Sequence, residues 1–155
     1  SVHPGIEVPD SRFAQFERLL YASPEYLARR GTPRTPSDLA QHDCIVLAGQ
    51  LPARWPLLVD GHITEVEVNS RLVVDNAEAA LRLTMAGGGI ARITNMHAAQ
   101  AQRDGTVVPV LAPFQLRQAI PLSAVYPEGR HRMPKVRVFL DFLAERFAEP
   151  DWNLR

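Results

Sequence analysis

The sequence predicts an α/β fold with helices packed on an open sheet, on three observations. Residues 71–93 have the pattern of a strand, a capped helix, a glycine stop and a second strand. Residues 55–68 have the pattern of a hairpin, and residues 134–147 that of an amphipathic helix. A strand–helix–strand unit joins parallel strands, and parallel sheets are covered by helices.

The elements before the central unit follow from local signals. Ser23-Pro24 begins a helix, because serine caps a helix and proline suits its first position. Asp60-Gly61 is a typical hairpin turn. The expected elements are an extended segment at 16–22, a helix at 25–30, one helical turn at 35–39, and strands at 44–47, 55–59 and 63–68.

The central unit starts with Leu72 to Val74, an apolar run typical of a buried strand. Asp75 is expected to cap the next helix, with Glu78 reaching back to it. Gly87 to Gly89 end that helix, and residues 90–93 resume the sheet. The expected buried helical face consists of Ala77, Ala80, Leu81, Thr84 and Met85.

The remaining elements are a helix capped by Thr94 or Asn95, strands at 106–111 and 119–126, and the helix at 134–147. That last helix carries a broad apolar stripe. Its members are Val136, Phe139, Leu140, Leu143 and Phe147.

The two parts of the chain differ in how complete they are. Residues 22–118 hold enough strands and helices for a full lobe, whereas the two ends supply one long helix and at most two strands to cover it. A two-stranded sheet is rarely stable alone. We therefore expect the first half of a second lobe to lie upstream of Ser1 or to come from another chain. An intact mass of the natural protein matching 155 residues would refute this.

The charge balance, hydropathy and cysteine content exclude several classes of partner and bond for this chain. The 17 basic and 17 acidic side chains balance, so this chain has no overall attraction to nucleic acid or to an anionic membrane. No apolar run approaches the roughly 20 residues that span a bilayer. Cys44 is the single cysteine, so no internal disulfide is expected, and its apolar strand predicts an inert core thiol.

Motifs for catalysis and metal binding are missing from the sequence. The five histidines are scattered without ligand spacing, so neither a metal site nor a cofactor is expected. No nucleophile elbow or phosphate-binding loop is found, because the triple glycine follows a helix rather than preceding one. We therefore do not expect an enzyme.

Three stretches carry a family resemblance that spans nearly the whole chain. They run from Tyr21 to Cys44, from Val74 to Ala91, and from Pro121 to Pro127 together with Pro134 to Leu143. In this order they resemble the effector-sensing region of LysR-type transcriptional regulators. One departure follows the Gly-Ile-Ala strand, where Arg92-Ile93-Thr94 replaces the family's apolar residue and Leu-Pro.

The resemblance implies a fold similar to the type 2 periplasmic binding proteins, with two α/β lobes around a cleft that holds a small molecule. Residues 1–21 and 119–155 would belong to a partial first lobe, and residues 22–118 would form a complete second lobe. It also implies a cytoplasmic homodimer that binds DNA only through an N-terminal helix-turn-helix absent from these residues. No membrane partner is expected.

Seven residues are candidates for the effector site. Open parallel sheets bind ligands where strands end and helices begin, which selects Asn76 and Ala77. Arg92 would hold a carboxylate in a two-point contact, or instead pair with a structural glutamate or lie at a lobe surface. The other candidates are Gly49, Gln50 and Thr94, and His3 in a first-lobe loop, with Gln50 equally compatible with a surface loop.

The leading function is therefore an effector-sensing domain of a transcription regulator. The alternative is a periplasmic-type solute-binding module for transport, which shares the fold and would carry a secretion signal. A small α/β enzyme is a third hypothesis, for which the sequence offers no nucleophile–base motif.

Overall fold

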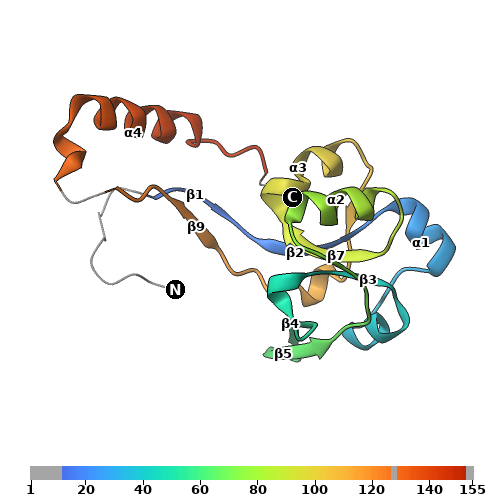
Figure 1. Cartoon of the computed structure of the whole chain (residues 1–155). Coiled ribbons are helices and arrows are strands. Elements are labelled where there is room, and N and C mark those ends of the chain that lie inside the picture. Colours follow the sequence, from blue (N-terminus) through green and yellow to red (C-terminus); the bar gives the residue numbers. More distant parts are fainter. Residues whose placement is uncertain (1–11, 127–128, 153–155) are drawn as a thin grey trace. The chain divides into compact units, whose positions relative to one another are not determined.

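The computed structural model describes residues 12–126 and 129–152, which divide into two units (Figure 1). The larger unit holds Glu17–Gln118 and Trp152, and the smaller holds the segment ending at Phe16 and Ala119–Asp151. The boundary expected at residue 21 thus differs from the observed division after Phe16. The reason is that residues 18–22 pair inside the sheet of the larger unit.

The larger unit is built on a five-stranded mixed sheet with the order β6-β3-β7-β2-β8. Strand β3 is parallel to both of its neighbours, whereas β2 is antiparallel to both of its own. These parallel strands come from the predicted strand–helix–strand unit and the apolar strand before it. The strands are β2 (Arg18–Ala22), β3 (Cys44–Leu47), β6 (Ser70–Val74), β7 (Ile90–Thr94) and β8 (Val108–Pro109).

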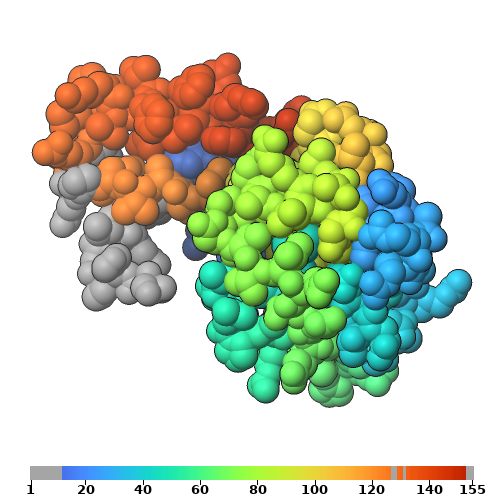
Figure 2. Space-filling model, turned by 45° about the vertical axis from the view of Figure 1, so that its right-hand side comes forward, coloured from blue at the N-terminus to red at the C-terminus, as the bar shows by residue number. Residues whose placement is uncertain are grey.

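Helices cover one face of this sheet and a hairpin covers the other. Helices α2 (Ala77–Met85) and α3 (Asn95–Arg103) pack against Tyr21, Ile45 and Ile93, and they lie side by side in Figure 2, in lime and gold. On the other face, the hairpin of β4 (Arg54–Val59) and β5 (His62–Glu67) buries Trp55 and Leu57 against Leu20. Both faces are therefore covered at the centre of the sheet. The edge strand β6 is largely exposed, with Leu72 at 37% and Val73 at 50%, which corrects the expectation of a buried strand there.

The connecting elements follow the predicted signals. The Ser23 hydroxyl accepts a hydrogen bond from the Tyr26 N–H at 3.1 Å and caps α1 (Pro24–Arg30). Thr35 and Asp38 form a capping box at η1 (Pro36–Gln41). Asp60 and Gly61 both have positive φ, as the two-residue hairpin turn requires. The remaining short helices are η2 (Ala48–Gln50), η3 (Ala112–Phe114) and η4 (Arg130–Arg132).

Gly89 is the tightest glycine position. It has φ +144°, and a Cβ at this residue would collide with the carbonyl oxygen of Asp43. The close approach lets the Ile90 N–H donate to that same oxygen at 2.9 Å, which places β7 beside β3.

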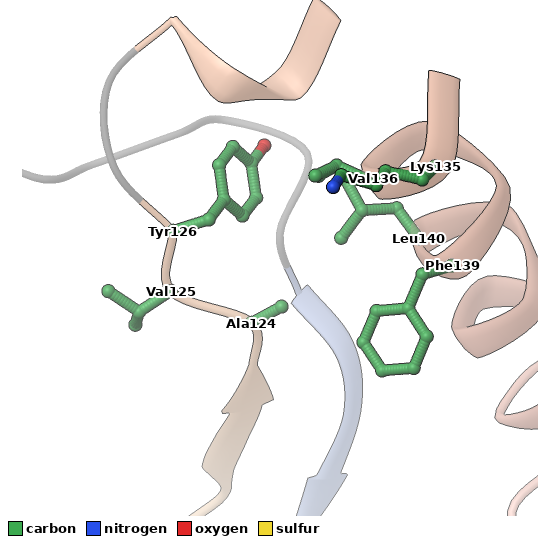
Figure 3. A pocket seen from close by; sticks show the side chains of 7 residues that line it. All are labelled: Ala124, Val125, Tyr126, Lys135, Val136, Phe139 and Leu140. Atoms are coloured by element: carbon green, nitrogen blue, oxygen red, sulfur yellow. The ribbon is translucent and has the colours of Figure 1, made fainter. Parts of the chain in front are cut away.

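The smaller unit contains two paired strands and one long helix. Strands β1 (Arg12–Phe16) and β9 (Ile120–Ser123) are antiparallel, with Arg12 opposite Ser123 and Phe16 opposite Ile120. Helix α4 (Pro134–Arg146) has no buried residue among those described. A pocket of about 300 Å³ separates its apolar residues Val136, Phe139 and Leu140 from the chain segment Ala124–Tyr126 (Figure 3).

Two expectations about buried helical faces are corrected. Phe139 is 56% exposed and Met85 is 40% exposed, although the sequence predicts both on buried apolar stripes. Met85 is the last residue of α2 and lies outside the core cluster that contains Ala80 and Leu81. Phe139 is exposed because no element of the described smaller unit covers that side of α4.

Candidate functional site

The candidate site lies at the carboxyl edge of the three parallel strands in the larger unit. Strand β3 leads directly to Gly49 and Gln50, β6 to Asn76 and Ala77, and β7 ends at Thr94. Since Leu47 is opposite Val74, and Ile45 is opposite Ala91, these strands end at one edge. The topology thus brings together five of the seven candidates, with Arg92 two residues before the edge. His3 lies outside the described residues.

Asn76, rather than Asp75, is the N-cap of α2. Its Oδ1 accepts from the Ala79 N–H at 2.8 Å, and its Nδ2 donates to Asp75 Oδ1 at 2.7 Å. Glu78, expected to reach back to Asp75, forms an ion pair with Arg82 instead. The prediction placed the helix start one residue early. The first-turn backbone N–H groups of a helix lie at its N-terminus, which here is at this edge, and such groups can bind anions.

Thr94 connects β7 to α3 and caps that helix. Its Oγ1 accepts from the His97 N–H at 3.3 Å and lies 2.7 Å from His97 Nδ1. Two helices of nine residues, α2 and α3, therefore begin at the same edge of the sheet. Their dipoles together favour a negative group there.

Arg92 is half-buried on the face of the sheet that the hairpin covers. Leu20, directly opposite Arg92, belongs to the same cluster as Trp55 and Leu57. Burial lowers the pKa of Arg92, and the charge of Arg18 acts in the same direction, whereas Glu65 opposes both. The Arg92 side chain makes no hydrogen bond or ion pair with the described part of the chain. The alternative of a structural glutamate partner is thus limited to the more distant Glu65.

Gln50 combines a half-buried side chain with an unsatisfied acceptor. Its Oε1 is buried and has no hydrogen-bond partner among the described residues, which is unusual for a folded protein. Gly49 beside it is exposed, and a Cβ there would meet nothing within 4 Å. A ligand donor would satisfy Gln50, while Gly49 offers open space for it.

Other chemically active side chains are inert or structural. Burial raises the pKa of the Cys44 thiol to about 12, so little thiolate forms at neutral pH. His42 is buried and its Nδ1 lies 2.8 Å from the Tyr26 hydroxyl. Within residues 12–126 and 129–152, no cluster of three potential metal ligands is found, and no helix there is long and apolar enough to cross a membrane.

The comparison with known proteins decides the family. The model of the LysR substrate binding domain matches residues 7–148. The chain belongs to the LysR substrate-binding domain family. The predicted resemblance and the α/β fold, which in LysR regulatory domains has the two-lobe architecture of periplasmic binding proteins, are both confirmed.

Individual relatives of this LysR domain are transcription regulators. The chain is 33% identical to the HTH-type transcriptional regulator CrgA of Neisseria meningitidis over 90% of its length and 45% of that protein. It is 30% identical to the HTH-type transcriptional activator TtdR of Escherichia coli over 94% of its length and 49% of that protein. The chain thus spans about half the length of the curated relatives it matches.

Among solved structures, the regulatory domain of CrgA matches 91% of this LysR domain with a TM-score of 0.79 and 28% identity. The chain covers 72% of that regulatory domain. These relatives favour a regulator over the transport module that was the alternative.

The sequence interpretation missed two features of this LysR domain. Glu17 and Asn95 exchange hydrogen bonds, from the Glu17 N–H to Asn95 Oδ1 at 2.9 Å and from the Asn95 N–H to the backbone carbonyl oxygen of Glu17 at 2.8 Å. Glu17 also forms an ion pair with Arg117 at 3.0 Å, which ties both ends of the larger unit's main segment together. The second missed residue is Arg18, whose proximity to Arg92 depends on the pairing of β2 with β7.

Proposed function

We propose that this chain is the effector-sensing domain of a LysR-type transcriptional regulator. Its effector would bind at the carboxyl edge of the larger unit, on Gly49, Gln50, Asn76, Ala77, Arg92 and Thr94. The observation that carries the proposal is the convergence of three parallel strand ends and two helix N-termini at one edge, in a member of this family. Open α/β sheets bind ligands at such edges.

The effector class that best suits this edge is a carboxylate. Arg92 offers an unpaired guanidinium, and the N-termini of α2 and α3 add favourable partial charges. The effector would shift the equilibrium between two domain arrangements by its difference in affinity for them, commonly about 1–3 kcal/mol. This role is one of binding rather than catalysis.

The test is an NMR titration of this chain with small aromatic and aliphatic carboxylic acids. For an acid that binds, we expect the largest amide shifts at residues 49–50, 76–77 and 92–94. Arg92→Gln should weaken that binding at least tenfold, whereas the matched control Arg71→Gln, on the exposed surface of β6, should not. Largest shifts at any other place, or unchanged affinity in Arg92→Gln, would contradict the proposed site.

The rest of the regulator follows from its relatives. We infer that the full protein is a cytoplasmic homodimer that binds DNA through a helix-turn-helix outside these residues, because the relatives are named as HTH-type regulators. Size-exclusion chromatography with light scattering of the full-length protein tests this. A dimer that binds operator DNA is expected, and a DNA-binding monomer would contradict the dimer.

We also propose that the exposed apolar side of α4 is covered in the full regulator by a segment of its first lobe. Val138, Phe139 and Phe142 are 69%, 56% and 56% exposed, and Phe139 also lines the apolar pocket of Figure 3. The match with this chain covers 72% of the CrgA regulatory domain, and the rest of that domain leaves room for such a segment. Phe139→Ala should cost about 3 kcal/mol in a chain with the preceding residues, as for a core phenylalanine. If Phe139→Ala lowered stability by the same small amount in the longer chain and in this chain, the proposed covering segment would be contradicted.

A further inference from the structure

Two arginines lie diagonally across β2 and β7 on one face of the sheet. In the register of these strands Arg18 is opposite Thr94, and Leu20 is opposite Arg92. Opposed residues in an antiparallel pair point to the same face, as do alternate residues of one strand. Arg18 and Arg92 therefore extend from the same face, and diagonal neighbours lie within reach of long side chains.

The positive charge of this pair is not neutralised by the described chain. Arg30, Arg82 and Arg117 each form an ion pair with a carboxylate, whereas Arg18 and Arg92 form none among the described residues. The charge of Arg18 is close enough to lower the pKa of Arg92, while Glu65 on β5 acts in the opposite sense from beyond ion-pairing distance. The pair thus carries a repulsion that a bound anion would remove.

The pair is also accessible. Arg18 is exposed and Arg92 is half-buried, so an anion could reach both guanidinium groups from solvent. Thr94, directly opposite Arg18, caps the nine-residue helix α3, whose N-terminus adds positive potential at the same end of β7.

We propose that Arg18 and Arg92 together form a two-point site for a doubly charged anion, and that the effector of this domain carries two negative groups. The inference rests on the proposed effector site and extends it from a single carboxylate contact to two guanidinium forks. Each fork matches the geometry of one carboxylate, or of two oxygens on a phosphate-type group. A singly charged effector would leave one arginine uncompensated.

The experiment is an NMR titration of this chain with inorganic sulfate, at constant ionic strength set with chloride, observing the arginine Nε–H signals. Sulfate carries the double charge without demanding a particular carbon skeleton. In the natural sequence we expect saturable shifts of the Arg18 and Arg92 signals. Arg18→Gln and Arg92→Gln should each weaken binding at least tenfold, and Arg18→Lys should be intermediate because it keeps the charge but loses the fork.

The matched control is Arg71→Gln, which removes the same charge from exposed β6 and should leave sulfate affinity unchanged. Unchanged amide spectra away from the substitutions verify folding. Linear, unsaturable shifts in the natural sequence, or an Arg18→Gln variant that binds sulfate normally, would overturn the two-arginine site. The proposed effector site fails separately, if carboxylic acids produce no shifts at the carboxyl edge.

Discussion

Each of the two units contains an amphipathic helix, but the apolar side of the helix is buried in the larger unit and largely exposed in the smaller one. In the larger unit, Ala80, Leu81 and Thr84 of α2 are buried between the sheet and α3. In the smaller unit, Phe139 of the α4 stripe and the neighbouring Val138 are more than half exposed. An apolar stripe thus predicts that a helix forms and which of its sides is suited to burial. Whether that side is covered depends on the other elements present.

The largest expected effect compares the cores of the two units directly. Trp55 is fully buried, so Trp55→Ala should lower the free energy of unfolding of the larger unit by about 4 kcal/mol. Phe139→Ala in this same chain should change stability by less than about 0.5 kcal/mol, because its side chain is already exposed. Urea denaturation followed by circular dichroism measures both. Equal losses of unfolding free energy in the two variants would contradict the difference between the two units.

A second prediction concerns the close approach of β7 to β3. Gly89→Ala should cost about 3 kcal/mol, since the added methyl collides with the Asp43 carbonyl at a positive φ. Gly105→Ala is the matched control, because φ is +75° there and nothing lies within 4 Å of the new Cβ. It should cost about 1 kcal/mol. Thermal unfolding distinguishes the two, and equal shifts would mean that the collision relaxes freely.

A smaller effect tests the helix start at the candidate site. Asn76→Ala removes the Oδ1 acceptor of the Ala79 N–H and should cost about 1 kcal/mol. Asn76→Ser should recover most of that loss, because serine caps helices nearly as well. If Asp75→Ala were the more costly change in the same denaturation assay, the cap would be Asp75 after all.

The smallest expected effect is a pH dependence confined to the larger unit. Burial lowers the pKa of His42 below its usual 6.5, so the folded state prefers the neutral ring beside the Tyr26 hydroxyl. Above pH 6.5 the ring is neutral in both states and its full contribution is present. As pH falls through the folded pKa, the unfolded chain gains the proton first and stability declines.

Unfolding midpoints measured between pH 5 and pH 8 check this. His42→Gln should flatten the profile, whereas His62→Gln, an exposed histidine of the hairpin, should leave the natural slope. A slope unaffected by His42→Gln would assign the pH dependence to other groups.

Much of the fold was predictable from local signals. Ser23, Asp60-Gly61 and the triple glycine fix where elements begin and end, because caps and turns depend on neighbouring residues only. The strand–helix–strand pattern predicted that β6 and β7 run parallel, and both are parallel to β3, although the position of β3 between them was not predicted. That topology also explains why five of the candidate site residues share one edge.

Features that depend on pairing between distant residues were not predictable. Arg18 lies near Arg92 only because β2 pairs with β7, which is 70 or more residues away in the sequence. The exchange of hydrogen bonds between Glu17 and Asn95 has the same origin. The division between the units shifted from residue 21 to Phe16 because β2 pairs with β7, a long-range choice that local patterns do not encode.

Hydrogen exchange of backbone amides tests most directly the claim that the larger unit has a complete core, whereas helix α4 of the smaller unit lacks an element that covers its apolar side. In this chain, amides of β2, β3 and β7 should exchange slowly, and those of α4 at nearly the rate of an unfolded chain. In a longer chain with the preceding regulatory-domain residues, α4 should become strongly protected. Protection of α4 equal to that of β7 in the 155-residue chain would contradict the account.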